Sequence, residues 1–476
     1  MRINMEKKNT WETYSSKQLK ELEKINAQYR DFLDNGKTER ECIDTIVNTI
    51  EKSGYRELES LIKEGTALKT GDKVYSVWMN KSIAMFQIGR KPMTEGMNIL
   101  GAHIDSPRLD VKQNPLYEDG GFAYLDTHYY GGVKKYQWVT IPLAIHGVIV
   151  KKDGTCVEIN IGENEDDPVF FVSDLLIHLA QEQLEKKAAK VIEGEALDII
   201  VGNKPLLIDK KDKKKDEKEA GKEAVKAGVL DILKETYDIH EEDFVSAELE
   251  IVPAGKAREA GFDRSMILAY GQDDRVCAYT SMQAMLDSDV TDRTMCCILV
   301  DKEEIGSVGA TGMQSHFFEN AVAELMNLTG EYSELHVRRC LAHSCMLSSD
   351  VSSAFDPTYA SSFDKKNVAY LGGGMVINKF TGARGKSGSN DANAEYLAHL
   401  RHIFDKAEVN FQTAELGKVD LGGGGTIAYI LALYGMNVID SGVAVLNMHA
   451  PWEATSKADV YETYRGYKAF VEGASL

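Results

Sequence analysis

Acidic and imidazole side chains follow five apolar segments of the sequence, at the points where strands would end. In open α/β sheets ligands bind at the carboxyl ends of the strands, so five such positions indicate one shared site. Two imidazoles and three carboxylates suit two Zn²⁺ ions bridged by one carboxylate, with Mn²⁺ or Co²⁺ as alternatives. The sequence therefore predicts a centre of two divalent metal ions, held by His103, Asp273, Glu304, Asp350 and His449.

Two further carboxylates lie beside these candidate ligands. Asp105 follows His103 by two residues, which places both side chains on one side of an extended segment, so Asp105 can orient the imidazole. Glu303 precedes Glu304, and adjacent side chains point in different directions, which leaves Glu303 free to act as a general base. Two metal ions can polarise an amide carbonyl and lower the pKa of a water. We expect hydrolysis of an amide bond.

Each position also has a structural interpretation. His103 and His449 could be packed core histidines, and Asp273 with Asp274 could cap a helix. The sequence contains no His-Glu-x-x-His, Gly-x-Ser-x-Gly or Walker A motif. The run 422–426 lacks the Lys-Ser/Thr ending of a phosphate loop, so we interpret it as a tight turn that approaches substrate, with Gly423 and Gly424 as candidate substrate contacts.

Hydrophobic periodicity predicts an α/β fold that positions these residues. The first 65 residues indicate helices, and short strands bounded by glycine follow. After about residue 260, strands alternate with helices, which is typical of a sheet with helical crossovers. The expected helices are 10–35, 38–52, 276–287 and 313–328, and the expected strands are 74–79, 82–88, 97–102, 265–270 and 294–300.

The middle of the chain has a different character. It combines three strand candidates at 138–144, 147–151 and 155–161 with a helical pattern over 172–188. A run of charges of both signs at 209–219 indicates an exposed loop or the start of a helix. We therefore expect an inserted second domain at 114–253 within a catalytic domain formed by 1–113 and 254–476.

Composition restricts the function classes further. The chain of 476 residues carries 55 basic and 74 acidic residues, a net charge of −19, which disfavours nucleic-acid binding. The polar N-terminus predicts no secretory signal, and no apolar stretch approaches the ~20 residues of a membrane span. Seven cysteines without a Cys-x-x-Cys pair indicate reduced thiols and a cytoplasmic location.

The sequence resembles the M18 metallo-aminopeptidases, the group of aspartyl and vacuolar aminopeptidases. The motifs that carry the resemblance are 101–108, 272–275, 301–307, 348–350 and 447–449. The resemblance implies that His103 and Asp350 bind one metal ion and that Glu304 and His449 bind the other. It also implies that Asp273 bridges the two ions, that Glu303 is the catalytic base and that Asp105 orients His103.

The resemblance implies an architecture as well. Members of the family have a zinc-peptidase-like mixed sheet flanked by helices, interrupted by a smaller β-rich dimerisation domain. They assemble from dimers into tetrahedral dodecamers that act on peptides. His178 corresponds to a histidine that completes the active site of a neighbouring protomer, although a histidine on an apolar helix could equally be a core residue.

Two departures from the family pattern leave questions open. Residues 136–140 replace a Trp-x-Asp-Arg-like segment of the acidic-selective members, so the preferred N-terminal residue stays open. Asp273-Asp274 stands where many members have Asp-Asn, which leaves open which aspartate bridges. Lys379, Arg384 and Lys386 are basic candidates for a pocket that accepts an acidic side chain.

Two other functions agree with the same residues. One is a related dinuclear-metal carboxypeptidase or N-deacylase, which would use the same ligands on a different peptide end or an acylated amine. The other is an inactive scaffold of the same fold, although such a scaffold would not need Glu303 beside the metal ligands.

Overall fold

The computed structural model describes residues 9–206 and 223–475, so the charged run at 209–219 lies outside the described residues. The chain divides into two compact units. Unit 1 comprises residues 1–106, 257–448 and 452–476, and unit 2 comprises residues 107–256 and 449–451. The inserted segment expected from the sequence, 114–253, lies within the segment 107–256 of unit 2.

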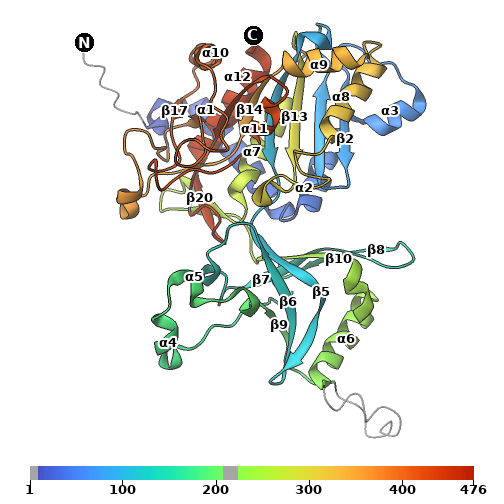
Figure 1. Cartoon of the computed structure of the whole chain (residues 1–476), viewed down its shortest axis with the longest axis vertical. Helices are drawn as coiled ribbons and strands as arrows, with labels where there is room; N and C mark the ends of the chain where they lie inside the picture. Colours follow the sequence, from blue (N-terminus) through green and yellow to red (C-terminus); the bar gives the residue numbers. More distant parts are fainter. Residues whose placement is uncertain (1–8, 207–222, 476) are drawn as a thin grey trace. The chain divides into compact units, whose positions relative to one another are not determined.

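Unit 1 is built on a mixed nine-stranded sheet (Figure 1). Four adjacent strands in its centre, β13, β4, β14 and β18, are parallel to one another, and β3 and β16 flank them in the antiparallel direction. In sheet order the strands are β1 (Arg56–Glu57), β2 (Lys73–Trp78), β3 (Ser82–Gln87), β13 (Thr294–Val300), β4 (Met97–His103), β14 (Cys345–Ser349), β18 (Asn437–Gly442), β16 (Met375–Asn378) and β17 (Phe411–Thr413).

The central strands are apolar on both faces because the sheet is covered on both sides. In β13, Cys297 and Leu299 pack into one core cluster, while Cys296 and Ile298 pack into the other. Successive side chains of a strand point to opposite faces, so a strand between two cores reads as a continuous apolar run. The sequence shows such runs at 97–102 and 294–300, and the strands expected there are present.

Helices of unit 1 cover the sheet, and the first two begin at polar caps. Ser15 with Gln18, and Thr38 with Glu41, form capping boxes that start the first two helices. The helices are α1 (Ser16–Asn35), α2 (Glu39–Glu51), α3 (Leu58–Glu64), α7 (Gln272–Leu286), α8 (Phe317–Leu328), α9 (Glu334–Ala342), α10 (Ala394–Lys406), α11 (Ala428–Ala432) and α12 (Lys457–Gly473). These elements confirm the α/β fold class.

A second sheet in unit 1 has five short strands. Their order is β11 (Arg258–Ala260), β12 (Met266–Ala269), β20 (Glu453–Ser456), β19 (Ala444–Leu446) and β15 (Ser352–Ser353). The apolar segment before His449 contains β19, and β20 follows it. The expected ligands therefore follow strands of two different sheets.

Unit 2 contains a six-stranded antiparallel sheet. In sheet order the strands are β8 (Cys156–Ile161), β7 (Leu143–Val150), β10 (Ala247–Pro253), β5 (Arg108–Asp119), β6 (Phe122–Tyr130) and β9 (Ile199–Gly202). The helix α6 (Ala224–Tyr237) packs near β5, β6 and β9. The strand expected at 147–151 belongs to β7, whereas most of the segment 138–144 lies before β7 begins and forms no strand.

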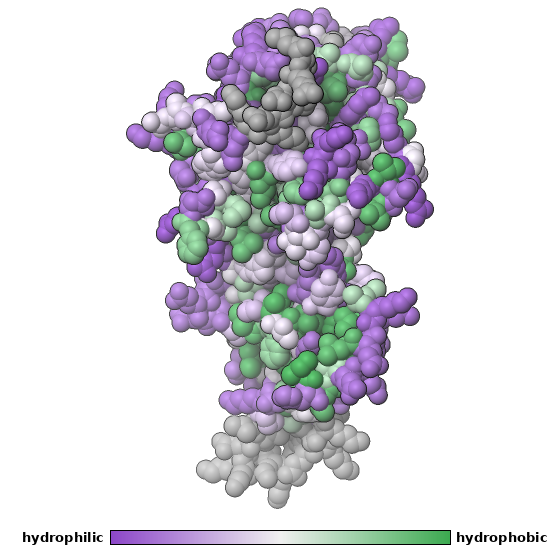
Figure 2. All heavy atoms as spheres, turned by 90° about the vertical axis from the view of Figure 1, so that its left-hand side faces the viewer, coloured by the Kyte–Doolittle hydropathy of each residue, from purple (hydrophilic) through white to green (hydrophobic). Residues whose placement is uncertain are grey.

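The helix expected over 172–188 is wrong. That segment holds only the short helices η4 (Ile177–Leu179) and α4 (Gln181–Leu184), followed by α5 (Ala188–Val191). Most of its large apolar side chains stay exposed within one chain, and packing of an apolar face is what stabilises most helices. Figure 2 shows hydrophobic side chains gathered on this face of unit 2. The apolar patch consists of Leu175, Leu176, Ile177, Leu179 and Leu184, which are 46–67% exposed.

Among the described residues, no helix combines the length and apolar character that crossing a membrane requires.

Candidate metal centre

Three parallel strands bring most of the predicted ligands to one edge of the nine-stranded sheet. The strand β4 ends at His103, and the turn after β13 carries Glu303 and Glu304. Asp350 follows directly after β14. The carboxyl ends of adjacent parallel strands meet at the same edge, which is why residues far apart in sequence converge here. Asp273 joins them from the first turn of α7, where its backbone is not helical.

The ligand atoms of these residues form three overlapping groups, each within 4.8 Å. Asp273 lies in one group with Glu304 and in another with Asp350, so it connects the two sides of the cluster. Asp274 lies beside it in the second of these groups. The three groups are His103, Asp273 and Glu304; His103, Glu303 and Asp350; and Asp273, Asp274 and Asp350.

The imidazole of His103 is buried and its two nitrogens face different partners. Its Nε2 lies 3.3 Å from Oδ1 of Asp273 and 4.0 Å from Oε2 of Glu303. Its Nδ1 lies 2.9 Å from the backbone oxygen of Asp105 and 3.3 Å from Oδ1 of the same residue. The Nε2 atom therefore points into the carboxylate cluster, and Asp105 contacts Nδ1 on the other side of the ring. Such a contact orients metal-binding histidines.

Asp105 does more than the sequence suggested. Its Oδ1 accepts a hydrogen bond from the backbone N–H of Glu303, and its Oδ2 accepts one from the backbone N–H of Glu304, both at 3.1 Å. The buried carboxylate thus fixes the turn that carries both glutamates against the end of β4. This second role depends on the pairing of β4 with β13 and has no signal in the local sequence.

The electrostatics of the cluster favour a bound cation. Burial lowers the pKa of His103, but hydrogen bonds to Asp105 and Asp273 outweigh it and raise the pKa well above its usual value. Loss of solvation, followed by the charges of Glu303, Asp273 and Asp274, raises the pKa of Asp350 well above its usual value. Several carboxylates that repel one another in a desolvated site are stabilised by cations.

The donor set fits divalent metal ions. It consists of one imidazole nitrogen and hard carboxylate oxygens, which are ligands of Zn²⁺ and similar ions. The donor atoms of each group lie within 4.8 Å of one another, and Asp105 contacts Nδ1 of His103. The residues present therefore fit the metal centre that the sequence predicts.

Asp273 is positioned by two residues that sequence reasoning did not select. Oγ of Ser106 donates to the backbone oxygen of Asp273 at 2.7 Å, and the backbone N–H of Asp273 donates to Oε2 of Glu453 at 3.0 Å. Glu453 is buried and pairs with Ala269 across β20 and β12. It lies four residues after His449, but only the pairing of these strands reveals its role.

His449 belongs to unit 2 and is in none of the three groups found among the described residues. Its Nδ1 lies 2.9 Å from the backbone oxygen of Gly132. The predicted role of His449 as a metal ligand stays a prediction.

The predicted substrate contacts belong to different units, His178 to unit 2 and the others to unit 1. His178 lies exposed in η4 within the apolar patch, so it is not a packed core histidine. Nζ of Lys379 lies 3.6 Å from Asp391. A Cβ atom at Gly423 would lie 2.0 Å from the backbone oxygen of Gly382, so close backbone packing explains this glycine. The backbone oxygen of Gly424 accepts a hydrogen bond from the same Gly382.

Comparisons with known proteins identify the family of the chain. The family described as "Aminopeptidase I zinc metalloprotease (M18)" matches residues 32–471. A "Probable M18 family aminopeptidase 1" from Clostridium acetobutylicum is 63% identical over 98% of both chains.

Two solved structures are similar over nearly their whole length. The crystal structure of the M18 family aminopeptidase from Thermotoga maritima has a TM-score of 0.92 at 44% identity and covers 99% of this chain and 100% of its own. The crystal structure of aminopeptidase I from Clostridium acetobutylicum has a TM-score of 0.89 at 60% identity, covering 98% and 99%. The fold, the clustered ligands and these similarities show that the chain belongs to the M18 family of zinc metallo-aminopeptidases.

Proposed function

We propose that this aminopeptidase removes N-terminal residues from peptides with two divalent metal ions, Zn²⁺ first among them. The observation that carries the proposal is the convergence of His103 with carboxylates from β13, β14 and α7 in overlapping groups within 4.8 Å. One group alone would suit a single ion. The overlap at Asp273 supports two adjacent positions with this carboxylate between them.

Each ligand has an assigned place in the proposal. His103 and Asp350 bind one ion, Glu304 and His449 bind the other, and Asp273 bridges them. The grouping of Asp273 with Glu304 on one side and with Asp350 on the other supports Asp273 as the bridge, and the grouping of His103 with Asp350 supports their place at one ion. Asp274 neighbours Asp273 in one group only, which favours Asp273 as the bridge.

Glu303 acts as the general base. When bound, the metal ions polarise the scissile carbonyl and lower the pKa of the attacking water. Glu303 takes the proton of that water and transfers it to the leaving amine. Its carboxylate suits this role because it lies at the cluster, 4.0 Å from Nε2 of His103, and stays 15% exposed. Asp105 holds the Glu303 backbone and thereby the position of the base.

The test is release of a free amino acid from a peptide with a free N-terminus. We expect a chelator to abolish release and Zn²⁺, Mn²⁺ or Co²⁺ to restore it. Chelator-insensitive activity would contradict the metal mechanism. An N-acetylated peptide should not be cleaved, whereas a carboxypeptidase or an N-deacylase would still act on it. A panel of peptides with Asp, Glu, Leu, Lys and Ala at the N-terminus determines the substrate preference and tests Lys379 as a substrate contact.

The proposed function includes a homo-oligomer built through unit 2, up to the tetrahedral dodecamer of the family. The apolar patch of unit 2 supports it, because monomeric proteins rarely expose contiguous apolar surfaces of this kind. His178 lies in the same patch, where a second copy of the chain would cover it. The seven cysteines are free thiols, which supports a reducing, cytoplasmic location.

A further inference from the structure

A buried carboxylate that is not among the predicted metal ligands lies in the nine-stranded sheet of unit 1. It belongs to Asp440 on β18, whose side chain is 1% exposed. Positions inside a covered sheet are usually apolar, and a buried charge costs free energy unless a hydrogen bond or an opposite charge compensates it. The contacts of Asp440 therefore indicate what this carboxylate does in the fold.

Asp440 lies close to the metal centre within the sheet. Ser348 of β14 pairs with Asp440 on one side and with Gly101 of β4 on the other. Paired residues of neighbouring strands point to the same face of a sheet, and so do alternate residues of one strand. Since Gly101 precedes His103 by two residues, Asp440 and His103 point to the same face, toward the same edge of the sheet.

The partner of Asp440 is a buried threonine. Oγ1 of Thr426 donates a hydrogen bond to Oδ1 of Asp440 at 2.6 Å. The same Oγ1 accepts a hydrogen bond from the backbone N–H of Ala428 at 3.2 Å, at the start of α11. Hydrogen bonds with an ionised partner are roughly twice as strong as neutral ones. Thr426 is therefore fixed to β18 and to the first residue of α11 at once.

This hydrogen bond holds one end of the glycine run 422–425, which Thr426 follows directly. Glycine residues have no side chains to pack and reach many backbone conformations, so a glycine run needs fixed points to keep one conformation. The backbone oxygen of Gly424 accepts a hydrogen bond from the backbone N–H of Gly382 at 2.9 Å, which connects the run to another loop. The bond between Thr426 and Asp440 connects it to the sheet.

Packing and electrostatics relate this end of the run to the metal centre. A Cβ atom at Gly101 would lie 3.4 Å from Cδ1 of Ile427, so the residue after Thr426 packs on the strand that ends at the metal centre. Loss of solvation raises the pKa of Asp440 to about 7, the hydrogen bond from Thr426 lowers it in part, and the charge of Glu303 raises it further. Asp440 therefore lies within electrostatic range of the proposed base.

We propose that Asp440 is a positioning residue that holds the glycine run 422–425, through Thr426, in the conformation that binds substrate. The inference rests on the proposed function and on the predicted substrate contacts at Gly423 and Gly424. Asp440 is buried and acts through Thr426 rather than by contact with the peptide. A displaced run weakens substrate binding but leaves the predicted metal ligands and the base in place, so the change falls on KM rather than on kcat.

Steady-state kinetics test this role, with a tripeptide from the panel above that the original protein cleaves. Thr426→Val keeps the shape of the side chain but removes the hydroxyl donor, so we expect KM to rise about tenfold, the loss of one charge-assisted hydrogen bond. We expect kcat and bound metal to stay at the level of the original protein. Thr426→Ser retains the hydroxyl and should retain the original KM.

A double variant tests whether Asp440 acts through Thr426. Asp440→Asn retains an accepting oxygen but loses the charge, so we expect KM to rise about threefold. KM of the double variant should equal that of Thr426→Val alone, because both changes act on the same hydrogen bond. An increase equal to the product of the two single increases would show that Asp440 acts without Thr426, and would overturn the proposal.

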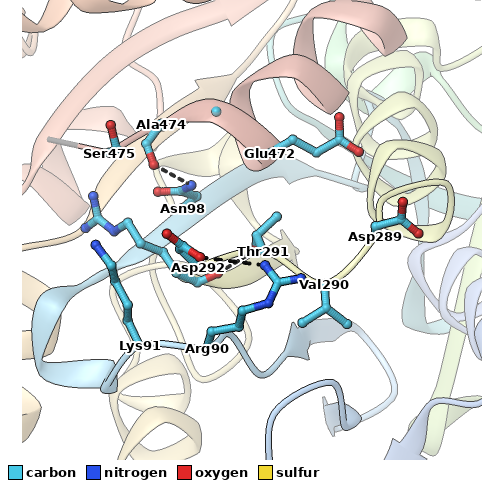
Figure 3. Close-up of a pocket in the computed structure, with 12 residues that line it drawn as sticks. Arg90, Lys91, Asn98, Asp289, Val290, Thr291, Asp292, Glu472, Ala474 and Ser475 are labelled. Carbon is cyan, nitrogen blue, oxygen red and sulfur yellow. Dashed lines mark hydrogen bonds and ion pairs between the residues drawn. The ribbon is translucent and has the colours of Figure 1, made fainter.

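Thr291→Val is the matched control. Oγ1 of Thr291 also donates a hydrogen bond of 2.6 Å, to the backbone oxygen of Arg293. Thr291 lines a polar cavity together with Asn98, near the start of β4 rather than at its carboxyl end (Figure 3). We therefore expect Thr291→Val to leave KM unchanged.

Two results of the kinetics would overturn the positioning role. One is an unchanged KM in Thr426→Val beside an active original protein. The other is loss of bound metal in Thr426→Val, which would show that the hydrogen bond supports the whole edge of the sheet rather than the glycine run. An original protein that releases no amino acid would instead contradict the proposed function.

Discussion

The carboxylate of Asp105 accepts a hydrogen bond from the backbone N–H of Glu303 at 3.1 Å. Asp105, which also contacts Nδ1 of His103, therefore positions the proposed base as well. One buried carboxylate supports a candidate metal ligand on β4 and the turn after β13 at the same time.

Replacing Asp105 with asparagine tests this relationship. The amide offers one accepting oxygen, so one of the N–H groups of Glu303 and Glu304 loses its partner. We expect kcat to fall about 10–100-fold, with weaker metal retention, as for other residues that support metal ligands. Kinetics and elemental analysis of bound metal measure both effects. Asp44→Asn, at an exposed position, should change neither. Unchanged kcat in Asp105→Asn would show that the backbone alone fixes the turn.

Replacing Glu303 separates the base from the ligands. We expect Glu303→Gln to lower kcat about 10²–10⁴-fold, the usual contribution of a general base, while bound metal stays at the level of the original protein. Glu304→Gln is the matched comparison and should lose metal as well as activity. Loss of metal in Glu303→Gln, or full activity in that variant, would contradict the proposed roles.

The apolar patch predicts an effect on assembly. A charge introduced at Ile177 or Leu179, both 67% exposed, would be buried without a partner if a second copy covers the patch. We expect Ile177→Asp and Leu179→Asp to dissociate the oligomer in light-scattering measurements of molar mass. Leu433→Asp, at an 81% exposed position in unit 1, is the control and should leave the mass unchanged. An unaltered mass in all three variants would place the interface elsewhere.

Asp459 predicts a pH-dependent stability. Burial raises the pKa of Asp459 to about 8, although the N–H groups of Gly372 and Gly374 donate to it and lower it in part. The folded chain then holds this proton more tightly than the unfolded chain between pH 4 and 8. The stability that protonation contributes is full below the ordinary pKa of 3.8 and is lost as pH rises through about 8.

Thermal unfolding of the original protein and of Asp459→Asn isolates this effect. Because asparagine stays neutral, we expect the original protein to lose stability relative to the variant from pH 5 to pH 8, by at most about 1.4 kcal/mol for each pH unit. Asp44→Asn should show no such trend. A constant difference in Tm between the original protein and Asp459→Asn across this range would show that Asp459 is ionised throughout.

Much of the site could be predicted from the sequence because its ligands follow buried strands. The apolar runs before His103 and Glu303 are covered on both faces, so their ends stand out as abrupt changes from apolar to polar residues. Asp350 follows β14 in the same way. These signals predicted the α/β fold class and the membership of the M18 family, and both predictions are confirmed.

Other features could not be predicted because they depend on contacts between distant segments. Glu453 supports Asp273 only because β20 pairs with β12. The segment 172–188 has a helical pattern, but most of its large apolar side chains stay exposed within one chain. Gly423 fits close packing against Gly382, a contact between two loops that periodicity does not describe.

The sequence by itself determined the fold class, the family, and the types and order of the candidate metal ligands, since these follow from local apolar patterns and short motifs. The tertiary structure decided which of them converge and how Asp105 and Glu453 hold them. The physical reason is that strand order in the sheet, rather than position along the chain, brings side chains within bonding distance.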